Sequence, residues 1–146
     1  MKISRRMLVW AYTAAAIAAL IGTWGNNLEY MALGLDPLAT NLHFWKETFA
    51  NPASQSITVD IFWLALPVTV WVMLEARRLK IPGIWWYLVL SWVVAVSVTV
   101  PLFMAARERR LIAANDSDAG FLSGAECVWL VALVIGSVVY TAGTLL

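Results

Sequence analysis

An apolar segment from Ile57 to Lys80 places the strongest constraint on how this chain can fold. It has membrane-spanning length, and it carries Asp60 near one end and Glu75 and Arg77 near the other. At about 1.5 Å of rise per residue, a helix from Asp60 to Glu75 covers roughly 22 Å. A bilayer's hydrocarbon core is about 30 Å thick. The two carboxylates can therefore lie close to opposite faces of a membrane.

The composition also indicates a membrane protein. Of the 146 residues, 62% are hydrophobic and 13% are charged, whereas soluble domains are about 45–50% apolar and about 25% charged. A net charge of +1, without a basic patch that contains aromatic residues, argues against nucleic-acid binding. Cys127 is the only cysteine and His43 the only histidine, so we expect neither a metal site nor another cofactor.

Four apolar runs predict four membrane-spanning helices in a single domain of residues 1–146. The first run follows a basic N-terminus and continues to Trp24 without a signal-peptide cleavage site, so we expect it to remain as a span. Residues 81–106 carry no charge, which is enough for one tilted span but too short for two. The predicted spans are 7–25, 57–78, 82–106 and 125–146.

A short amphipathic helix is predicted between the first two spans. Asp36-Pro37 is typical of an N-cap followed by proline at the first helical position. From there, Leu38, Leu42 and Trp45 fall on one helical face, which predicts a helix over residues 37–50 lying in the membrane interface. The predicted fold class is therefore all-α, a membrane-embedded four-helix bundle with an additional short interfacial amphipathic helix.

The distribution of lysine and arginine predicts the orientation, because cytoplasmic flanks carry an excess of these residues. With the N-terminus inside, four spans place six basic residues at the inner face. The four at the outer face are Lys46, Arg107, Arg109 and Arg110. This bias predicts that both termini are cytoplasmic.

Several motifs occur in a fixed order along the first three spans: Phe49-Ala50-Asn51, Asp60, Glu75-Ala76-Arg77-Arg78, Val100-Pro101-Leu102-Phe103 and Arg107-Glu108. With these residues the chain resembles a family of small bacterial membrane proteins classed only as a domain of unknown function. The resemblance covers about residues 1–110, so the fourth predicted span lies beyond it. It implies a multi-pass protein of the bacterial inner membrane, and it implies no activity.

Ionisable groups in or near spans are costly, so each is a candidate functional residue with a partner to be identified. The predicted topology places four of them at the outer face: Asp60, Arg107, Glu108 and Glu126. We expect Arg107 to pair there with Asp60 or Glu126, which would join three spans.

At the inner face, Glu75 is the central candidate. Arg78 lies three residues further along the same helix, within reach of an ion pair, and Arg5 and Arg6 of the first span are alternatives. The simplest interpretation is that both groups of charges hold the helices together at the membrane boundaries.

Nine tryptophans bear on the possible activities. Seven lie near predicted span ends, as in the aromatic belts of membrane proteins, whereas Trp71 and Trp92 lie nearer mid-span. A membrane-embedded isoprenoid or terpene cyclase would need an acid whose pKa is raised by desolvation and aromatic faces that stabilise a carbocation. Asp60 or Glu126 would be this catalytic acid, in a cavity lined by Trp63, Trp71 and Trp92.

Three functions therefore stay open. The first is a non-enzymatic accessory or interaction protein, which we favour; the second is the cyclase; the third is an oligomeric transporter or channel subunit. Small residues in the first and fourth spans would allow close approach of another helix. The expected partners are the lipid bilayer and either another membrane protein or further copies of this chain.

Overall fold

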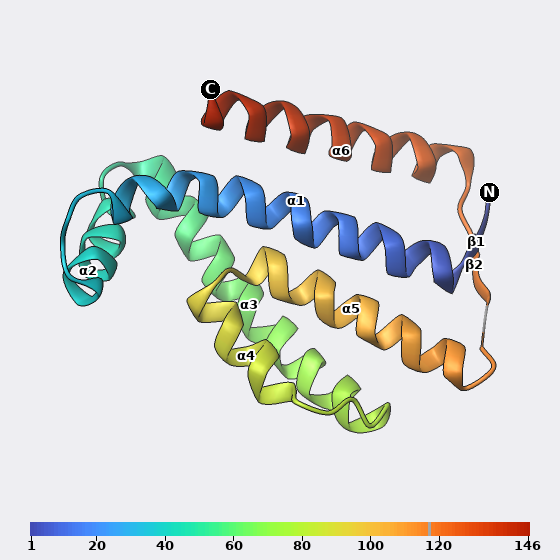
Figure 1. Cartoon of the computed structure of the whole chain (residues 1–146). Coiled ribbons are helices and arrows are strands. Elements are labelled where there is room, and N and C mark those ends of the chain that lie inside the picture. Colours follow the sequence, from blue (N-terminus) through green and yellow to red (C-terminus); the bar gives the residue numbers. More distant parts are fainter. Residues whose placement is uncertain (117) are drawn as a thin grey trace.

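The computed structural model describes residues 1–116 and 118–146, and these residues form six helices and one two-stranded ribbon (Figure 1). The all-α class predicted from the sequence is confirmed. In chain order the elements are β1 (Lys2–Ser4), α1 (Arg5–Met31), α2 (Pro37–Glu47), α3 (Pro52–Arg78), α4 (Ile84–Val93), α5 (Val96–Ala113), β2 (Asp118–Phe121) and α6 (Gly124–Leu145).

Three of the helices, α1, α3 and α6, are long and apolar enough to cross a membrane. They contain 27, 27 and 22 residues, which correspond to lengths of about 40, 40 and 33 Å. Each exceeds the roughly 30 Å of a hydrocarbon core. The chain therefore has the helices of a membrane protein.

Residues 82–106 do not form the single span predicted from their hydropathy. The helix ends at Val93 and a new one begins at Val96, so α4 and α5 form an antiparallel helical hairpin (Figure 1). With ten residues, α4 is about 15 Å long, roughly half of a hydrocarbon core. Instead of continuing as the predicted third span, the chain turns back toward the end from which it came.

The break between α4 and α5 lies within a valine-rich run, residues 93–100, whose β-branched side chains favour helices less than unbranched ones do. A side chain takes up one backbone carbonyl at the break, because the indole Nε1 of Trp24 in α1 donates to the Val94 carbonyl at 3.3 Å. The Ala95 carbonyl begins α5 by accepting from the Val98 and Thr99 backbone N–H groups, and the Thr99 hydroxyl also donates to it at 3.1 Å. Irregular backbone at membrane depth is tolerated where protein groups satisfy it in this way.

Helix α1 lies between α5 and α6 (Figure 1). It packs along α5, and it approaches α6 near the C-terminal ends of both helices, where Gly22 lies against Thr141 and Gly25 against Leu145. At the other end, β1 pairs antiparallel with β2. Helices α1 and α6 therefore run in the same direction, and the two termini lie at opposite ends of the molecule (Figure 1). This arrangement differs from the predicted one, in which a fourth crossing returned the C-terminus to the side of the N-terminus.

Helix α2 begins as its sequence predicts, because the Asp36 carboxylate accepts hydrogen bonds from the backbone N–H groups of Leu38 and Ala39. Its Phe44 ring meets Tyr30 of α1 edge-on, with ring centroids 5.6 Å apart. The Leu38 side chain is exposed. One face of α2 thus packs on the molecule, while the apolar side chains of Leu38 and Leu42 remain exposed.

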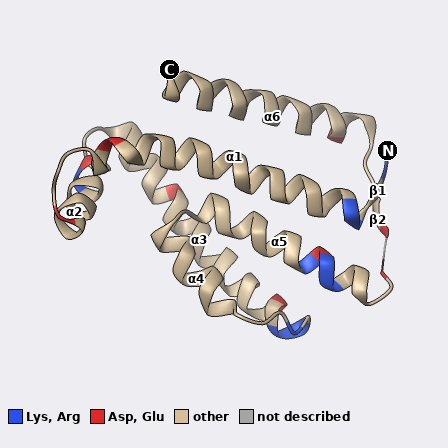
Figure 2. Ribbon diagram, viewed as in Figure 1, with Lys and Arg blue, Asp and Glu red and all other residues tan. Residues whose placement is uncertain are grey.

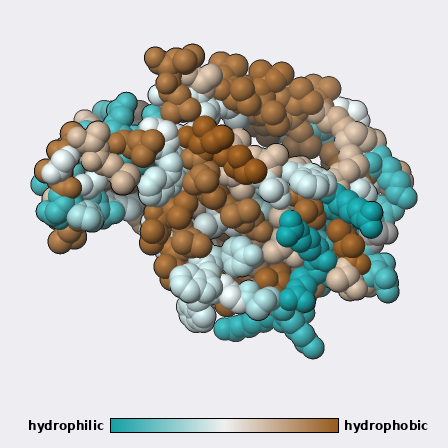
Figure 3. Space-filling model, in the orientation of Figure 1, coloured by the Kyte–Doolittle hydropathy of each residue, from teal (hydrophilic) through white to brown (hydrophobic). Residues whose placement is uncertain are grey.

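The buried core is small and lies where α3 meets the α4–α5 hairpin. Val72, Ala76, Ile81 and Phe103 form its centre. Apolar side chains cover much of the outer surface, and hydrophilic ones gather over α2 and, elsewhere, around the end of α5 and the turn between α3 and α4 (Figure 3). An apolar middle between hydrophilic ends is the surface expected of a membrane-embedded bundle.

Candidate functional site

A cluster of ion pairs ties three helices together at one end of the molecule. Glu75, near the end of α3, accepts hydrogen bonds from Arg78 Nε at 2.7 Å and from Arg107 Nε of α5 at 2.6 Å. Arg107 also donates to the neighbouring Glu108. Glu108 in turn accepts from Arg5 Nη1 of α1 at 2.8 Å. We call Arg5, Glu75, Arg78, Arg107 and Glu108 the ion-pair network.

The centre of the ion-pair network is buried. Only 2% of the Glu108 side chain and 10% of the Glu75 side chain are exposed to solvent. Arg5 extends the network to an exposed residue, because its Nη2 donates to Asp116, in the loop after α5, at 2.6 Å. Buried carboxylates without partners would be costly, so the arginines and the carboxylates require one another.

The structure corrects one predicted pairing and bears out another. Arg107 was expected to pair with Asp60 or Glu126 at the outer face, but it pairs with Glu75 and Glu108. The cause is the α4–α5 hairpin, which returns the end of α5 to the end of α3. The predicted pair of Glu75 with Arg78 is present, with Arg78 Nη2 2.5 Å from Glu75 Oε1.

Asp60 and Glu126 lie apart from the ion-pair network. Asp60 is on an exposed face of α3 and makes no hydrogen bond within the described residues. Glu126 forms a capping box at the start of α6, where its Oε2 accepts from the Ser123 backbone N–H at 2.7 Å. The structure therefore gives Glu126 a local role in starting a helix, since such a box satisfies backbone donors that the helix leaves free.

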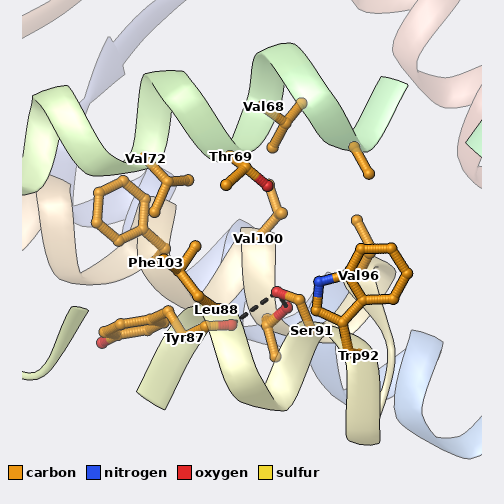
Figure 4. Close-up of a pocket in the computed structure, with 12 residues that line it drawn as sticks. Val68, Thr69, Val72, Tyr87, Leu88, Ser91, Trp92, Val96, Val100 and Phe103 are labelled. Carbon is orange, nitrogen blue, oxygen red and sulfur yellow. Dashed lines mark hydrogen bonds between the residues drawn. The ribbon is translucent and has the colours of Figure 1, made fainter. Parts of the chain in front are cut away.

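A small cavity of about 20 Å³ lies between α3, α4 and α5 (Figure 4). This volume corresponds to about one water molecule. Its lining is mostly apolar, and the Ser91 and Thr99 hydroxyls meet at its edge with their oxygens 2.5 Å apart. The bond joins α4 to α5 close to the break between them.

Of the three tryptophans predicted to line a cavity, one does so. Trp92 lines the cavity between α3, α4 and α5 (Figure 4). Trp71 packs edge-on against Phe103, with ring centroids 5.6 Å apart, and Trp63 is 71% exposed. The acids and the aromatic residues expected of a cyclase are therefore not gathered around one space in the described part of the chain.

Nine of the ten lysine and arginine residues lie at the end that holds the ion-pair network, which we call the basic end (Figure 2). Lys46 in α2 lies at the opposite end. The nine are Lys2, Arg5, Arg6, Arg77, Arg78, Lys80, Arg107, Arg109 and Arg110. The sequence prediction divided them between two faces, because it took residues 82–106 as a complete crossing.

The described residues contain no cluster of three or more His, Cys, Asp or Glu residues that could hold a metal ion.

Asp118, in the ribbon beside the network, pairs with Lys2 at 3.1 Å. Its carboxylate also accepts a hydrogen bond from the Gly120 backbone N–H, and these two contacts lower its pKa.

A family model described as a protein of unknown function, DUF2834, matches residues 11–109. The match covers more than half of the chain and ends within α5, so α6 lies beyond it. No curated protein and no solved structure matches the chain at a significant level. The resemblance to a family of unknown function, inferred from the motifs, is confirmed.

Proposed function

The chain belongs to DUF2834, a family of proteins of unknown function, and on that premise we propose that it is an accessory protein of the bacterial inner membrane that acts through interactions rather than catalysis. The ion-pair network carries this proposal. Glu75 and Glu108 are engaged by Arg5, Arg78 and Arg107, so these charges hold α1, α3 and α5 together. Each carboxylate of the network has an arginine partner, and only Arg5 Nε among its buried side-chain atoms lacks a hydrogen bond; such ion pairs can specify how helices pack.

The proposed orientation places the basic end in the cytoplasm. Cytoplasmic flanks of membrane helices are enriched in lysine and arginine, and nine of the ten such residues lie at this end. With α1 and α6 running in the same direction (Figure 1), the N-terminus would be cytoplasmic and the C-terminus would face the opposite side. Helix α2 would lie at the outer interface.

The proposal is tested by extracting the protein in mild detergent and measuring the mass of the particle. An accessory protein is expected to migrate with a different polypeptide at a fixed ratio. A particle that contains only copies of this chain would overturn the proposal and favour the transporter or channel subunit.

A second measurement addresses the cyclase directly. Lipid extracts of cells with and without the protein are expected to contain the same isoprenoids. The proposal fails if an isoprenoid product depends on the protein and disappears in the variant Asp60→Asn combined with Glu126→Gln. Glu47→Gln, at an exposed position of α2, is the matched control for removing a carboxylate without affecting a candidate acid.

A further inference from the structure

The nine cations of the basic end fall into two groups. Four of them form ion pairs with carboxylates: Lys2 with Asp118, and the three arginines of the ion-pair network with Glu75, Glu108 and Asp116. The other five have no carboxylate partner within the described residues, and all are exposed: Arg6, Arg77, Lys80, Arg109 and Arg110. The second group is therefore a positive surface that the protein itself does not neutralise.

Four of these free cations come from two segments that the fold joins. Arg77 and Lys80 lie at the turn after α3, and Arg109 and Arg110 lie near the end of α5. The bond from Arg107 Nε to Glu75 Oε1, 2.6 Å long, holds the ends of these two helices together. The ribbon in Figure 2 has the basic residues of both segments at the same end of the molecule, and hydrophilic side chains gather there in Figure 3.

The turn that carries Lys80 is itself fixed. Lys80 has a positive φ of 51°, and the following residue, Ile81, donates its backbone N–H to the Ala76 carbonyl at 2.9 Å. These contacts close the C-terminus of α3 in a left-handed cap. Ile81 is buried in the core with Phe103. The positive charges on either side of the turn are thus presented by an ordered backbone.

Two exposed tryptophans indicate the level at which this surface would lie in a membrane. Trp85 and Trp86 begin α4 just after the turn, and each is 70% exposed. Exposed tryptophans are characteristic of the layer in which headgroups meet the hydrocarbon. Because α3 is about 40 Å long and the hydrocarbon is about 30 Å thick, its end also reaches the headgroups.

We propose that Arg77, Lys80, Arg109 and Arg110, beside Trp85 and Trp86, form a binding surface for the phosphates of anionic phospholipids. Arginine binds phosphate through paired N–H donors, and lysine contributes a compact positive charge. Basic side chains at a membrane surface attract anionic lipids. The inference rests on the proposed placement in a membrane, but it depends neither on the orientation nor on a protein partner.

The experiment measures lipid binding to the purified full chain in nanodiscs. Discs of phosphatidylcholine containing increasing phosphatidylglycerol are compared, with the number of retained phosphatidylglycerol molecules determined after exchange. The wild-type protein is expected to retain phosphatidylglycerol over phosphatidylcholine, and the preference should fall as salt is added, because salt screens surface charges. Equal retention of the two lipids would overturn the inference.

Two double variants locate the surface. Arg77→Gln with Lys80→Gln, and Arg109→Gln with Arg110→Gln, should each weaken phosphatidylglycerol binding on the order of 25-fold, about five-fold for each charge removed. Lys46→Gln removes the one cation of the opposite end and is the matched control, expected to leave binding unchanged. A similar loss in Lys46→Gln would contradict the assignment to the basic end.

Free phosphate compounds separate a lipid surface from a soluble-anion site. Inorganic phosphate and glycerol phosphate, at concentrations matched to the lipid phosphate, are expected not to displace phosphatidylglycerol. Displacement by either would overturn the inference in favour of a soluble anion. Elution as a single particle and unchanged helical circular dichroism establish that each variant is folded, and the salt dependence of the wild-type protein tests the inference without any substitution.

Discussion

Arg5 and Glu108 are 103 residues apart in the sequence, and Arg5 Nη1 lies 2.8 Å from Glu108 Oε2. The bond joins the first turn of α1 to the last third of α5. The two helices run antiparallel along most of their shared length (Figure 1), so this pair fixes their relative position at the basic end. Glu108 has a second partner in Arg107, which leads on to Glu75 and α3.

Replacing Glu108 with alanine should therefore destabilise the protein by up to about 3–5 kcal/mol, because Arg5 and Arg107 each lose one of their two carboxylate partners at a buried position. The free energy of unfolding is measured by titrating mixed micelles with a denaturing detergent. Glu47→Ala, at an exposed position of α2, should change it by less than about 0.5 kcal/mol. Equal effects of the two variants would contradict a structural role for the network.

Trp24→Phe should weaken the contact between α1 and the α4–α5 break by about 1–3 kcal/mol, because the Val94 carbonyl loses its donor in a poorly hydrated place. The same micelle titration measures the change. Trp129→Phe serves as the control, since Trp129 is 69% exposed. If both substitutions have the same small effect, the indole bond does not stabilise the break.

The proposed orientation can be examined with single cysteines. In a Cys127→Ala background, Ala114→Cys reports on the basic end and Leu146→Cys on the C-terminal end; both positions are exposed. A membrane-impermeant maleimide should label Leu146→Cys in intact spheroplasts and Ala114→Cys only in inverted vesicles. The four-span prediction requires the reverse pattern, with Ala114→Cys labelled in intact spheroplasts and Leu146→Cys labelled only in inverted vesicles.

Acidification should affect the β1–β2 ribbon at a pH set by Asp118. Its pKa lies below the ordinary value of 3.8, because the Gly120 backbone N–H and Lys2 both favour the charged carboxylate. The stabilisation by these contacts is therefore complete above 3.8 and is lost as the pH falls through the lowered pKa. The Gly120 amide proton shift, followed by NMR, should titrate with a midpoint below 3.8. A midpoint at or above this value would contradict the bonding at Asp118.

Much of the fold can be predicted from local sequence signals. Hydropathy identifies the three long helices α1, α3 and α6, and Asp36-Pro37 marks the start of α2. The break at Val94–Ala95 gives no comparable signal, since neither glycine, proline nor a charged residue lies there. The side chain that bonds the Val94 carbonyl there belongs to Trp24, which is 70 residues away. A hydropathy profile averages over neighbouring residues, so it does not indicate a contact between residues that are far apart in the sequence.

The partners of Arg107 were mispredicted for the same reason. When residues 82–106 are predicted to cross the membrane once, Arg107 and Glu108 are placed at the same membrane face as Asp60, and Glu75 has no predicted partner in α5. The charge count contained a signal against this topology, because six basic residues at one face and four at the other give only a weak bias. Moving Arg107, Arg109 and Arg110 to the other face makes it nine against one, which favours a hairpin over a crossing.

In the proposed membrane placement, the α4–α5 hairpin also determines the parity of the crossings. Because the hairpin would enter and leave on the same side, α1 and α3 would contribute two complete crossings and bring the chain back to its starting compartment. Helix α6 would then make the number odd. A domain fused after Leu146 would consequently be delivered to the compartment opposite the basic end, whereas the same domain fused after β2 would stay on the side of the N-terminus.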